Sequence, residues 1–175
     1  MTYFDNLCRA MEMIAEQPRS IFLGQAVAEK GTGMTASFAG VPREKLLELP
    51  VFEDCQLGMS IGLALDGMLP VSVYPRMNFL LLAMNQLVNH LDAIPRFSAY
   101  RPKVIIRVAV GTDKPLDPGP QHLGDHTAAL RLMLRKVRVV QLRVASQVVE
   151  HYKEAVEHSA STLLIEYPEL YETGD

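Results

Sequence analysis

Apolar residues follow two patterns along this chain: in some segments they recur at helical spacing, and in others they form uninterrupted runs. Phe4, Leu7, Met11 and Ile14 follow each other at intervals of three or four residues, which is typical of an amphipathic helix. We therefore predict a helix over residues 2–17, ended by the proline that follows it.

Continuous apolar runs rich in β-branched residues predict buried strands, and the clearest of them is 103–110. The same criteria predict strands at 19–24, 49–52, 69–74, 137–142 and 162–166, and helices at 54–66, 77–92, 127–134 and 146–158. Strands that alternate with helices and are apolar on both faces indicate a parallel sheet covered on both sides. We therefore expect an α/β fold, a single three-layer α/β/α domain over 1–175 with a mainly parallel sheet.

Glycine, proline and charged residues mark the connections between these elements. Residues 29–33 are rich in glycine and charge and predict a loop, and 111–120 is a second segment of glycine and proline. Residues 38–48 are predicted to form a short helical or irregular connection. Gly67 is a natural stop for the helix that precedes it.

Composition and charge narrow the class of protein. Hydrophobic residues make up 49% of the chain and charged residues 21%, which is typical of a globular domain. A net charge of -3 argues against a nucleic-acid surface, and the basic residues of 131–138 are expected to form a solvated helix end. Cys8 and Cys55 are too few for a disulfide framework, and no apolar run is long enough to span a bilayer. We expect a cytoplasmic protein with reduced thiols and no membrane partner.

One acidic residue lies at the start of a predicted apolar helix that contains two glycines. Glu53 precedes Gly58 and Gly62, which are four residues apart and therefore share a face without side chains. Each interior glycine costs a helix about 1 kcal/mol relative to alanine, so the pattern indicates that something approaches this face closely. The two interpretations are tight packing inside one domain and contact with a second helix or a flat ligand.

Three polar features follow the predicted strands. Glu53 comes after one strand, the turn at 74–79 after the next, and His122 after the strongest one. Ligands of parallel α/β sheets bind beyond the carboxyl ends of the strands. The topology therefore predicts one site that contains all three features.

The spacings of these residues resemble a known family. The residues that carry the resemblance are Glu53, Gly58, Gly62, Gly67, Pro70, Asn78, Phe79, Gln86, Asn89, Arg107, Gly111, Gln121, His122 and the ending 163–171. Together they resemble the pyrimidine-binding domain of transketolase-type thiamine diphosphate enzymes, and most closely the beta subunit of the 2-oxo acid dehydrogenase first component. The resemblance extends from about residue 21 to residue 171.

The resemblance implies roles for individual residues. Glu53 matches the glutamate that hydrogen-bonds the aminopyrimidine of thiamine diphosphate and activates it, and His122 matches the active-site histidine beside the reacting carbonyl. Phe79 matches the aromatic residue that packs on the aminopyrimidine, and Pro75 and Gln25 occupy further cofactor-binding positions. Without the resemblance, the simpler interpretations are a helix-start carboxylate for Glu53, a core residue for Phe79 and a loop histidine bonded to solvent for His122. The spacing of the histidines around His122 fits no zinc pattern, so we expect no metal on this chain.

Several positions depart from the family pattern. Gln25 and Ala26 replace a common acidic pair, and 97–100 replaces a Ser-Gly-Gly sequence. Arg76 lies where the family is usually apolar or aromatic, so it either contacts an acidic substrate or the cofactor, or blocks the pocket.

The family's diphosphate-binding motifs, Gly-Asp-Gly and a downstream Asn-Asn, do not occur in this sequence, and neither does its C-terminal domain. The resemblance therefore implies a pyrimidine-binding subunit that shares thiamine diphosphate with an alpha-type partner chain, which would also hold Mg²⁺. Self-association into a dimer or a heterotetramer is expected. The reaction would be decarboxylation and acyl transfer of a 2-oxo acid or ketol transfer. The alternatives are a non-catalytic relative that regulates or scaffolds such an enzyme, and an unrelated α/β domain.

Overall fold

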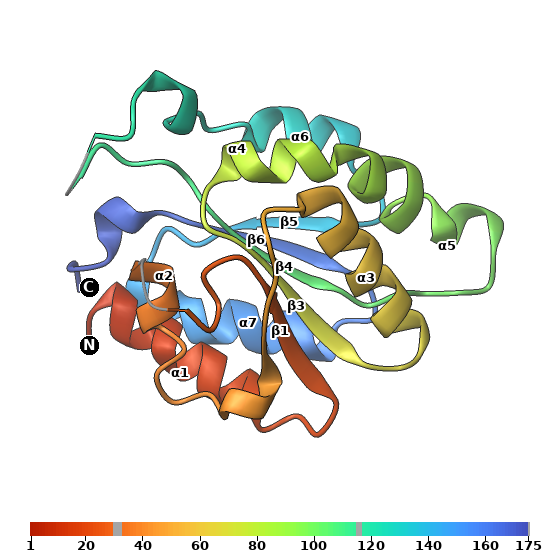
Figure 1. The fold of residues 1–175 in the computed structure, drawn as a ribbon, viewed down its shortest axis with the longest axis horizontal. Helices are drawn as coiled ribbons and strands as arrows, with labels where there is room; N and C mark the ends of the chain where they lie inside the picture. Colours follow the sequence, from red (N-terminus) through yellow and green to blue (C-terminus); the bar gives the residue numbers. More distant parts are fainter. Residues whose placement is uncertain (30–32, 115–116, 175) are drawn as a thin grey trace.

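The computed structural model describes residues 1–29, 33–114 and 117–174. Their strands form a six-stranded sheet in the order β2-β1-β3-β4-β6-β5, and every neighbouring pair is parallel (Figure 1). The strands are β1 (Ser20–Gly24), β2 (Leu46–Glu48), β3 (Leu69–Tyr74), β4 (Ile105–Ala109), β5 (Arg138–Gln141) and β6 (Thr162–Glu166). The predicted α/β fold with a mainly parallel sheet is confirmed.

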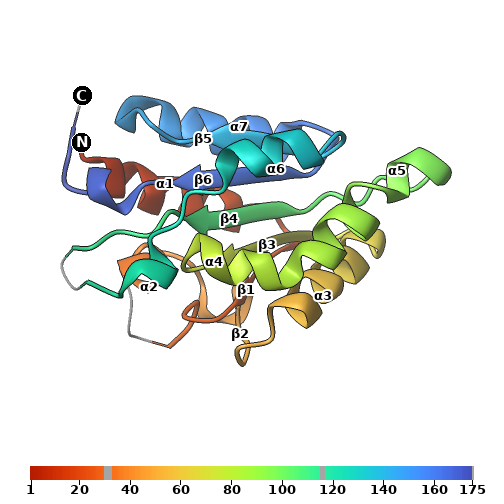
Figure 2. The same cartoon turned by 90° about the horizontal axis from the view of Figure 1, so that it is seen from above.

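Helices cover both faces of the sheet (Figures 1 and 2). The longer helices and short turns are α1 (Tyr3–Ala15), α2 (Gly33–Ala36), η1 (Arg43–Lys45), α3 (Glu53–Leu65), α4 (Met77–Leu80), η2 (Leu81–Ala83), η3 (Asn85–Leu91), α5 (Ile94–Phe97), η4 (Pro120–His122), α6 (Thr127–Met133), η5 (Ala145–Gln147), α7 (Val148–Glu157) and η6 (Pro168–Leu170). One apolar core joins α1, α2 and α7 to one face of the sheet, and a second joins α3, α4, η3 and α6 to the other. Strands that are buried on both faces explain why their sequences are continuously apolar.

The first helix shows how local sequence sets these boundaries. Thr2 caps α1, because its hydroxyl accepts from the backbone N–H of Asp5 while the Asp5 carboxylate accepts from the N–H of Thr2. The apolar side chains at helical spacing all face the core, and α1 lies along α7. The predicted helix over 2–17 is therefore confirmed, with its ordered ends at Tyr3 and Ala15.

The predicted strand at 49–52 is wrong. The strand that pairs with β1 is β2, which ends at Glu48 opposite Gly24. The N–H of Leu49 still donates to the carbonyl oxygen of Gly24 at 2.9 Å. Pro50 has no N–H to continue the ladder, so the chain leaves the sheet there.

The predicted single helix over 77–92 is helical but not one α-helix. Its backbone passes from α4 through the 3-10 turn η2 into η3, which is a π-helix. The N–H of Asp92 donates to the carbonyl oxygen of Leu87, five residues earlier, at 2.9 Å. The short helices α2 and α5 were not predicted, and the predicted loop at 29–33 falls largely on residues 30–32, outside the described residues.

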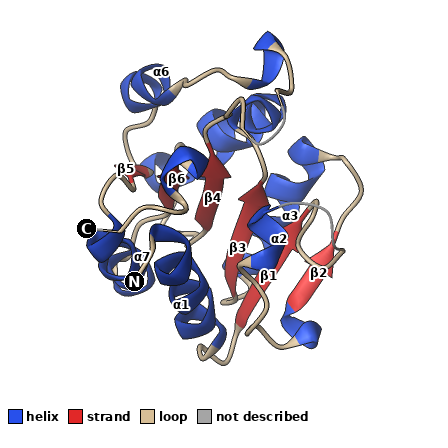
Figure 3. Ribbon diagram, turned by 90° about the vertical axis from the view of Figure 1, so that its left-hand side faces the viewer, coloured by secondary structure: helices blue, strands red, loops and turns tan. Residues whose placement is uncertain are grey.

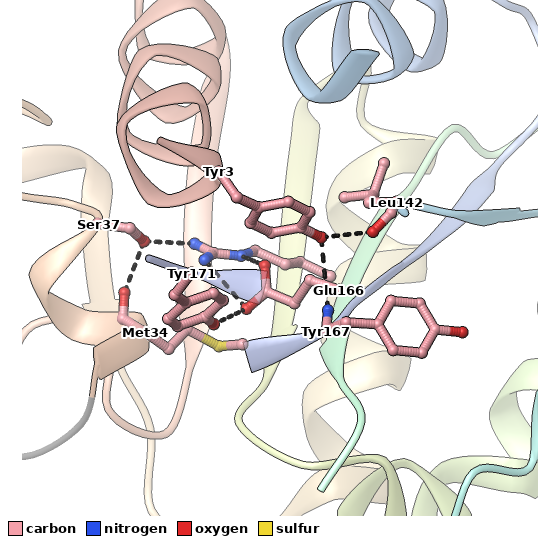
Figure 4. A network of polar contacts seen from close by, with 8 residues as sticks. Tyr3, Met34, Ser37, Leu142, Glu166, Tyr167 and Tyr171 are labelled. Atoms are coloured by element: carbon pink, nitrogen blue, oxygen red, sulfur yellow. Dashed lines mark hydrogen bonds and ion pairs between the residues drawn. The ribbon is translucent and has the colours of Figure 1, made fainter. Parts of the chain in front are cut away.

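A buried ion pair joins two neighbouring strands, from the middle of β4 to the carboxyl end of β6. Arg107 on β4 and Glu166 on β6 are both fully buried, and the Nε–H of Arg107 donates to Oε2 of Glu166 at 2.9 Å. The same guanidinium group donates to the hydroxyl of Ser37 at 2.7 Å and lies 5.1 Å over the Phe38 ring. The Tyr171 hydroxyl donates to Oε1 of Glu166 at 2.6 Å (Figure 4). The ion pair therefore ties the sheet to the segment after α2 and to the end of the described chain.

The two ends of the described chain lie side by side (Figure 1). The backbone N–H of Tyr3 donates to the carbonyl oxygen of Thr173 at 2.7 Å, and that of Phe4 donates to Tyr171 at 3.1 Å. The Tyr3 hydroxyl donates to the carbonyl oxygen of Leu142 at 2.8 Å. Burial, with the Glu166 carboxylate nearby, raises the pKa of Tyr3 far above its ordinary value, so Tyr3 stays a donor.

We predict that Arg107→Met destabilises the chain by about 3–5 kcal/mol, because Glu166 is left as a buried charge without its partner. The free energy of unfolding, measured by urea denaturation, tests this. Arg138→Met is the matched control, since its pair with Glu154 at 3.4 Å is partly exposed and should cost under about 1 kcal/mol. Equal losses in the two variants would contradict the prediction.

Candidate functional site

The candidate site lies where the carboxyl ends of the strands meet, which is the side of the sheet toward which the arrowheads in Figure 3 point; we call it the carboxyl edge. Gln25 follows β1, Pro75 follows β3, and His122 lies on the turn η4 in the long connection after β4. Glu53 begins α3, which packs on β1 and β3. The fold thus places the predicted residues at one edge, and their individual contacts decide what they can do.

Glu53 is buried but lacks partners. Its residue is only 7% exposed, and Oε1 is buried with no hydrogen-bond partner. None of the described backbone N–H groups donates to its carboxylate, so it does not cap the helix that it begins. A buried carboxylate oxygen without a donor is costly, and such groups concentrate at functional sites.

Gln56 holds the start of α3 against the sheet. Its side-chain Nε2 donates to the carbonyl oxygen of Val73 at 2.9 Å and to the hydroxyl of Ser72 at 3.1 Å. Gly24 makes room for this contact, because a Cβ there would lie 3.0 Å from Nε2 of Gln56 and 2.4 Å from the Val73 oxygen. Gln56 lies one turn after Glu53. Its two hydrogen bonds to β3 fix the position of the Glu53 carboxylate, and we call them the Gln56 clamp. The sequence analysis missed it, although a glutamine within an apolar helix was a signal.

Tyr74 connects Glu53 to the end of β3. Its hydroxyl donates to the backbone carbonyl oxygen of Glu53 at 3.4 Å and lies 3.3 Å from the Ser72 hydroxyl. Burial raises the pKa of Tyr74 above its ordinary value, and the nearby Glu53 carboxylate raises it further. Tyr74 therefore remains a neutral donor at physiological pH.

Phe79 and His122 are in contact. Their ring centroids are 5.7 Å apart with the planes tilted by 59°. Nδ1 of His122 and Oδ1 of Asn78 are buried, and neither has a hydrogen-bond partner in the described chain. Gly111 allows the His122 backbone to cross the end of β4, since a Cβ there would lie 1.6 Å from the carbonyl oxygen of His122. These contacts bring two of the predicted residues together beside two unsatisfied polar atoms.

A polar cluster that the sequence analysis missed supports the segment after His122. Both the backbone N–H and the hydroxyl of Thr127 donate to Oδ1 of Asp125, at 2.9 and 2.5 Å. Burial alone would raise the pKa of Asp125, but these hydrogen bonds outweigh it and hold the pKa below its ordinary value. Tyr167 lies 3.5 Å from the other carboxylate oxygen, and the guanidinium group of Arg143 lies 4.0 Å over the Tyr167 ring. The cluster links the His122 segment to the ends of β5 and β6.

The loop that carries Gln25 is organised by Glu48. The Glu48 carboxylate accepts four backbone N–H groups, those of residues 26–29, at 2.7 to 3.1 Å. Ala26 adopts a φ of 59°, which turns these donors toward one point. Gln25 and Pro75 are half-buried, and the Gln25 side chain makes no hydrogen bond with the described residues.

The glycine face of α3 is not tightly packed within the described chain. A Cβ at Gly62 would meet nothing within 4 Å, and one at Gly58 would lie 3.6 Å from the Gln86 side chain. The interpretation as a tight internal contact is therefore wrong for Gly62. Exposed apolar side chains flank this face on α3, on the turn before it and on the adjacent η2; we name this set the α3 surface, and its members are Val51, Phe52, Met59, Leu81 and Leu82.

Two hollows that described residues form lie away from the candidate site. One, of about 190 Å³, is bordered by Pro102, Val137 and Ser161, which precede β4, β5 and β6 and so mark the amino edge of the sheet. A second, of about 510 Å³, is bordered by Pro18 and Leu69 at the same edge. Neither includes a predicted site residue.

Within residues 1–29, 33–114 and 117–174, no three or more His, Cys, Asp and Glu side chains are grouped so that they could hold a metal ion. No described helix has the length and apolar character needed to cross a membrane.

Comparison with known proteins gives relatives of one kind. No family model matches the sequence. The chain is 27% identical over 168 residues to the pyruvate dehydrogenase E1 component subunit beta of Staurastrum punctulatum, covering 91% of this chain and 49% of that protein. It is 31% identical over 99 residues to the 2-oxoisovalerate dehydrogenase subunit beta of Bacillus subtilis (strain 168), covering 54% of this chain and 30% of that protein. The chain thus spans about half the length, or less, of these curated relatives.

A solved structure is similar in fold. The split gene transketolase, an inactive beta4 tetramer, superposes with a TM-score of 0.77 at 17% identity and covers 100% of this chain and 53% of that one. The resemblance to transketolase-like pyrimidine domains, and to beta subunits of the 2-oxo acid dehydrogenase first component, is thereby confirmed.

We predict that Glu48 makes the stability of the chain depend on pH in the acid range. Burial alone would raise its pKa, but the hydrogen bonds from residues 26–29 lower it below the ordinary 4.5. A lowered folded-state pKa stabilises the chain at pH values above 4.5, and this contribution is lost as the pH falls through the folded pKa.

Urea midpoints of the wild type and Glu48→Gln, measured from neutral pH down to about pH 3, test this. The wild type should be more stable near neutral pH, and the difference should shrink as the pH falls. Glu44→Gln, at an exposed residue of η1, is the control and should leave the pH profile unchanged. A constant difference between the wild type and Glu48→Gln would contradict the prediction.

Proposed function

We propose that this chain is the pyrimidine-binding subunit of a split thiamine diphosphate-dependent enzyme that acts on a 2-oxo acid or a ketose. The observation that carries the proposal is Glu53, whose buried Oε1 has no partner at the carboxyl edge of the sheet. Similarity to the beta subunits of pyruvate and 2-oxoisovalerate dehydrogenases supports the general kind of enzyme.

The free polar atoms at this edge fit the pyrimidine half of the cofactor. An aminopyrimidine offers ring nitrogens, an amino group and a flat face, and so needs a carboxyl partner and an aromatic neighbour. Glu53 offers an unpartnered carboxylate oxygen, and Phe79 offers a half-buried ring beside His122. Glu53 and Phe79 would hold the ring, with Gln25 and Pro75 lining the site. When bound, the cofactor supplies a carbon nucleophile for the carbonyl of the substrate.

Each residue of the chain has a separate task in this proposal. Glu53 exchanges a proton with a ring nitrogen of the pyrimidine, and the Gln56 clamp keeps its carboxylate in place. His122 moves a proton at the oxygen of the reacting carbonyl, which suits an imidazole near neutral pH. Phe79 excludes water from the ring face.

The proposal requires a second chain. An alpha-type partner would bind the diphosphate and Mg²⁺; the similarity to beta subunits and to a split gene transketolase supports this arrangement. The α3 surface, with the open face at Gly62, supports an interface there, either with that partner or with a second copy of this chain. We accordingly propose a dimer or heterotetramer in the cytoplasm.

The alternative is a non-catalytic relative that regulates or scaffolds such an enzyme. Arg76 favours it, because a cation lies where the family pattern is apolar or aromatic. Identifying the partner by co-purification, and testing whether it carries Gly-Asp-Gly and Asn-Asn, separates the two functions.

We predict that Glu53→Gln, in the complex with the alpha-type partner, lowers kcat about 10²- to 10⁴-fold, because the amide cannot exchange the proton. Turnover of pyruvate and of a ketose phosphate tests this. Glu150→Gln, a change of the same kind on the distant helix α7, is the control and should keep full activity. Full activity of the Glu53 variant would show that the assigned role is wrong.

A second prediction concerns the chain without its partner. Because only the pyrimidine half of the cofactor meets this chain, the isolated protein should bind thiamine diphosphate with a Kd above about 100 μM, weaker than about 5.5 kcal/mol. Calorimetry of the isolated chain and of the complex measures the difference. Micromolar binding by the isolated chain would refute the shared site.

A further inference from the structure

We propose that Arg76 binds the anionic group of the substrate, a carboxylate or a phosphate, and thereby selects acidic substrates. This inference rests on the proposed function and deepens it.

The first observation is a missing partner. Three arginines of the described chain are not exposed, namely Arg76, Arg107 and Arg138. Arg107 pairs with the Glu166 carboxylate, and Arg138 pairs with that of Glu154. Arg76 is half-buried too, yet its guanidinium group makes no hydrogen bond, ion pair or ring contact with any described residue. No nitrogen of Arg76 is among the buried polar atoms that lack a partner, so the guanidinium group reaches solvent and is free to bind an anion that approaches it.

The second observation is its place in the fold. Arg76 follows β3 by two residues, at the edge where Glu53 and His122 also lie. The backbone N–H of Phe79 donates to the carbonyl oxygen of Arg76 at 3.1 Å, so the turn that carries Arg76 also sets the Phe79 ring beside His122. Asn78, within the same turn, has a buried Oδ1 without a partner. The unpaired cation therefore belongs to the same turn as the proposed reaction site.

The third step identifies the anion. The pyrimidine half of the cofactor carries no negative charge, and its diphosphate is assigned to the partner chain, so the cofactor gives Arg76 no anion here. Arginine presents a planar fork of donors that matches a carboxylate or a phosphate through two parallel hydrogen bonds. A 2-oxo acid carries its carboxylate next to the reacting carbonyl, and a ketose phosphate carries its phosphate at the far end. Both are oxyanions that such a fork can hold.

The test compares Arg76→Gln and Arg76→Lys in the complex purified through a tag on this chain, with thiamine diphosphate and Mg²⁺ added. Arg76→Gln should raise the KM for the acidic substrate by about 10- to 100-fold, the worth of one hydrogen-bonded charge pair, with a smaller change in kcat. Arg76→Lys should recover part of the loss, because it keeps the charge without the fork. Arg96→Gln, on the exposed helix α5, is the matched control.

Comparing substrates shows whether Arg76 binds a carboxylate or a phosphate. A rise in KM for pyruvate points to the carboxylate. A rise for fructose 6-phosphate with none for unphosphorylated fructose points to the phosphate. If a variant has too little turnover to assay, binding of a phosphonate analogue of pyruvate to the complex, measured by calorimetry, should weaken by a similar factor.

Three results would overturn the inference: an unchanged KM for every anionic substrate, loss of thiamine diphosphate binding in Arg76→Gln, or loss of the complex itself. The second would assign Arg76 to the cofactor, and the third to the partner chain. The Glu53→Gln complex keeps the two proposals apart. If it is inactive while Arg76→Gln has the wild-type KM, only the role of Arg76 fails, whereas full activity of Glu53→Gln removes the proposed function.

Discussion

The ion pair between Arg107 and Glu166 is the constraint on which the centre of the fold depends. Two opposite charges are shielded from water in the middle of a parallel sheet, and each is stable there only because the other is present. Their partners come from α2, through the segment that follows it, and from the end of the described chain, through the Tyr171 hydroxyl. The pair therefore ties the middle of β4 to the carboxyl end of β6, and it connects both strands to the segment after α2 and to the end of the described chain. Because Glu166 is the last residue of β6, the pair lies beside the carboxyl edge that carries the candidate site.

Two local contacts, one a hydrogen-bonded amide and one a close backbone approach, then place the candidate residues on that edge. The Gln56 amide bonds α3 to β3, which sets the height of Glu53 above the strand ends. Gly111 lets the backbone of η4 lie against the end of β4, which brings His122 to the Phe79 ring. The cores hold the layers together, and these two close contacts determine where Glu53 and His122 lie.

Much of the fold could be predicted from the sequence, because the strands are buried on both faces and their apolar runs are continuous. β3 and β6 were predicted to the residue, since β-branched segments with clear ends leave little choice. β2 was misplaced because Leu49 and Val51 look like strand residues, while Pro50, which ends the pairing, was not weighed. The π-helical turns of η3 were not predictable, because hydrogen-bond pattern within a helix leaves no mark on apolar spacing.

The candidate site was predicted residue by residue only where the family resemblance reached. Glu53, Phe79 and His122 were named as candidates in this way, whereas Gln56 and the cluster of Asp125, Tyr167 and Arg143 were not. These groups act through contacts between segments far apart in the sequence, so no local pattern marks them. That Arg76 has no partner among the described residues could be seen only in the structure, because the sequence does not tell which side chains surround it.

The backbone N–H groups of residues 26–29, in the loop after β1, are all occupied by a carboxylate of the same chain. Four successive backbone donors converge there in a geometry that other proteins use to hold phosphate groups. In this chain the donors are already saturated by an internal anion, the Glu48 carboxylate. An external diphosphate would have to displace a covalently tethered competitor, whose effective concentration is far higher than that of any free ligand. Because Glu48 occupies these donors, the loop that begins at Gln25 does not offer them to another anion. A negatively charged group that approaches this edge must bind to other donors.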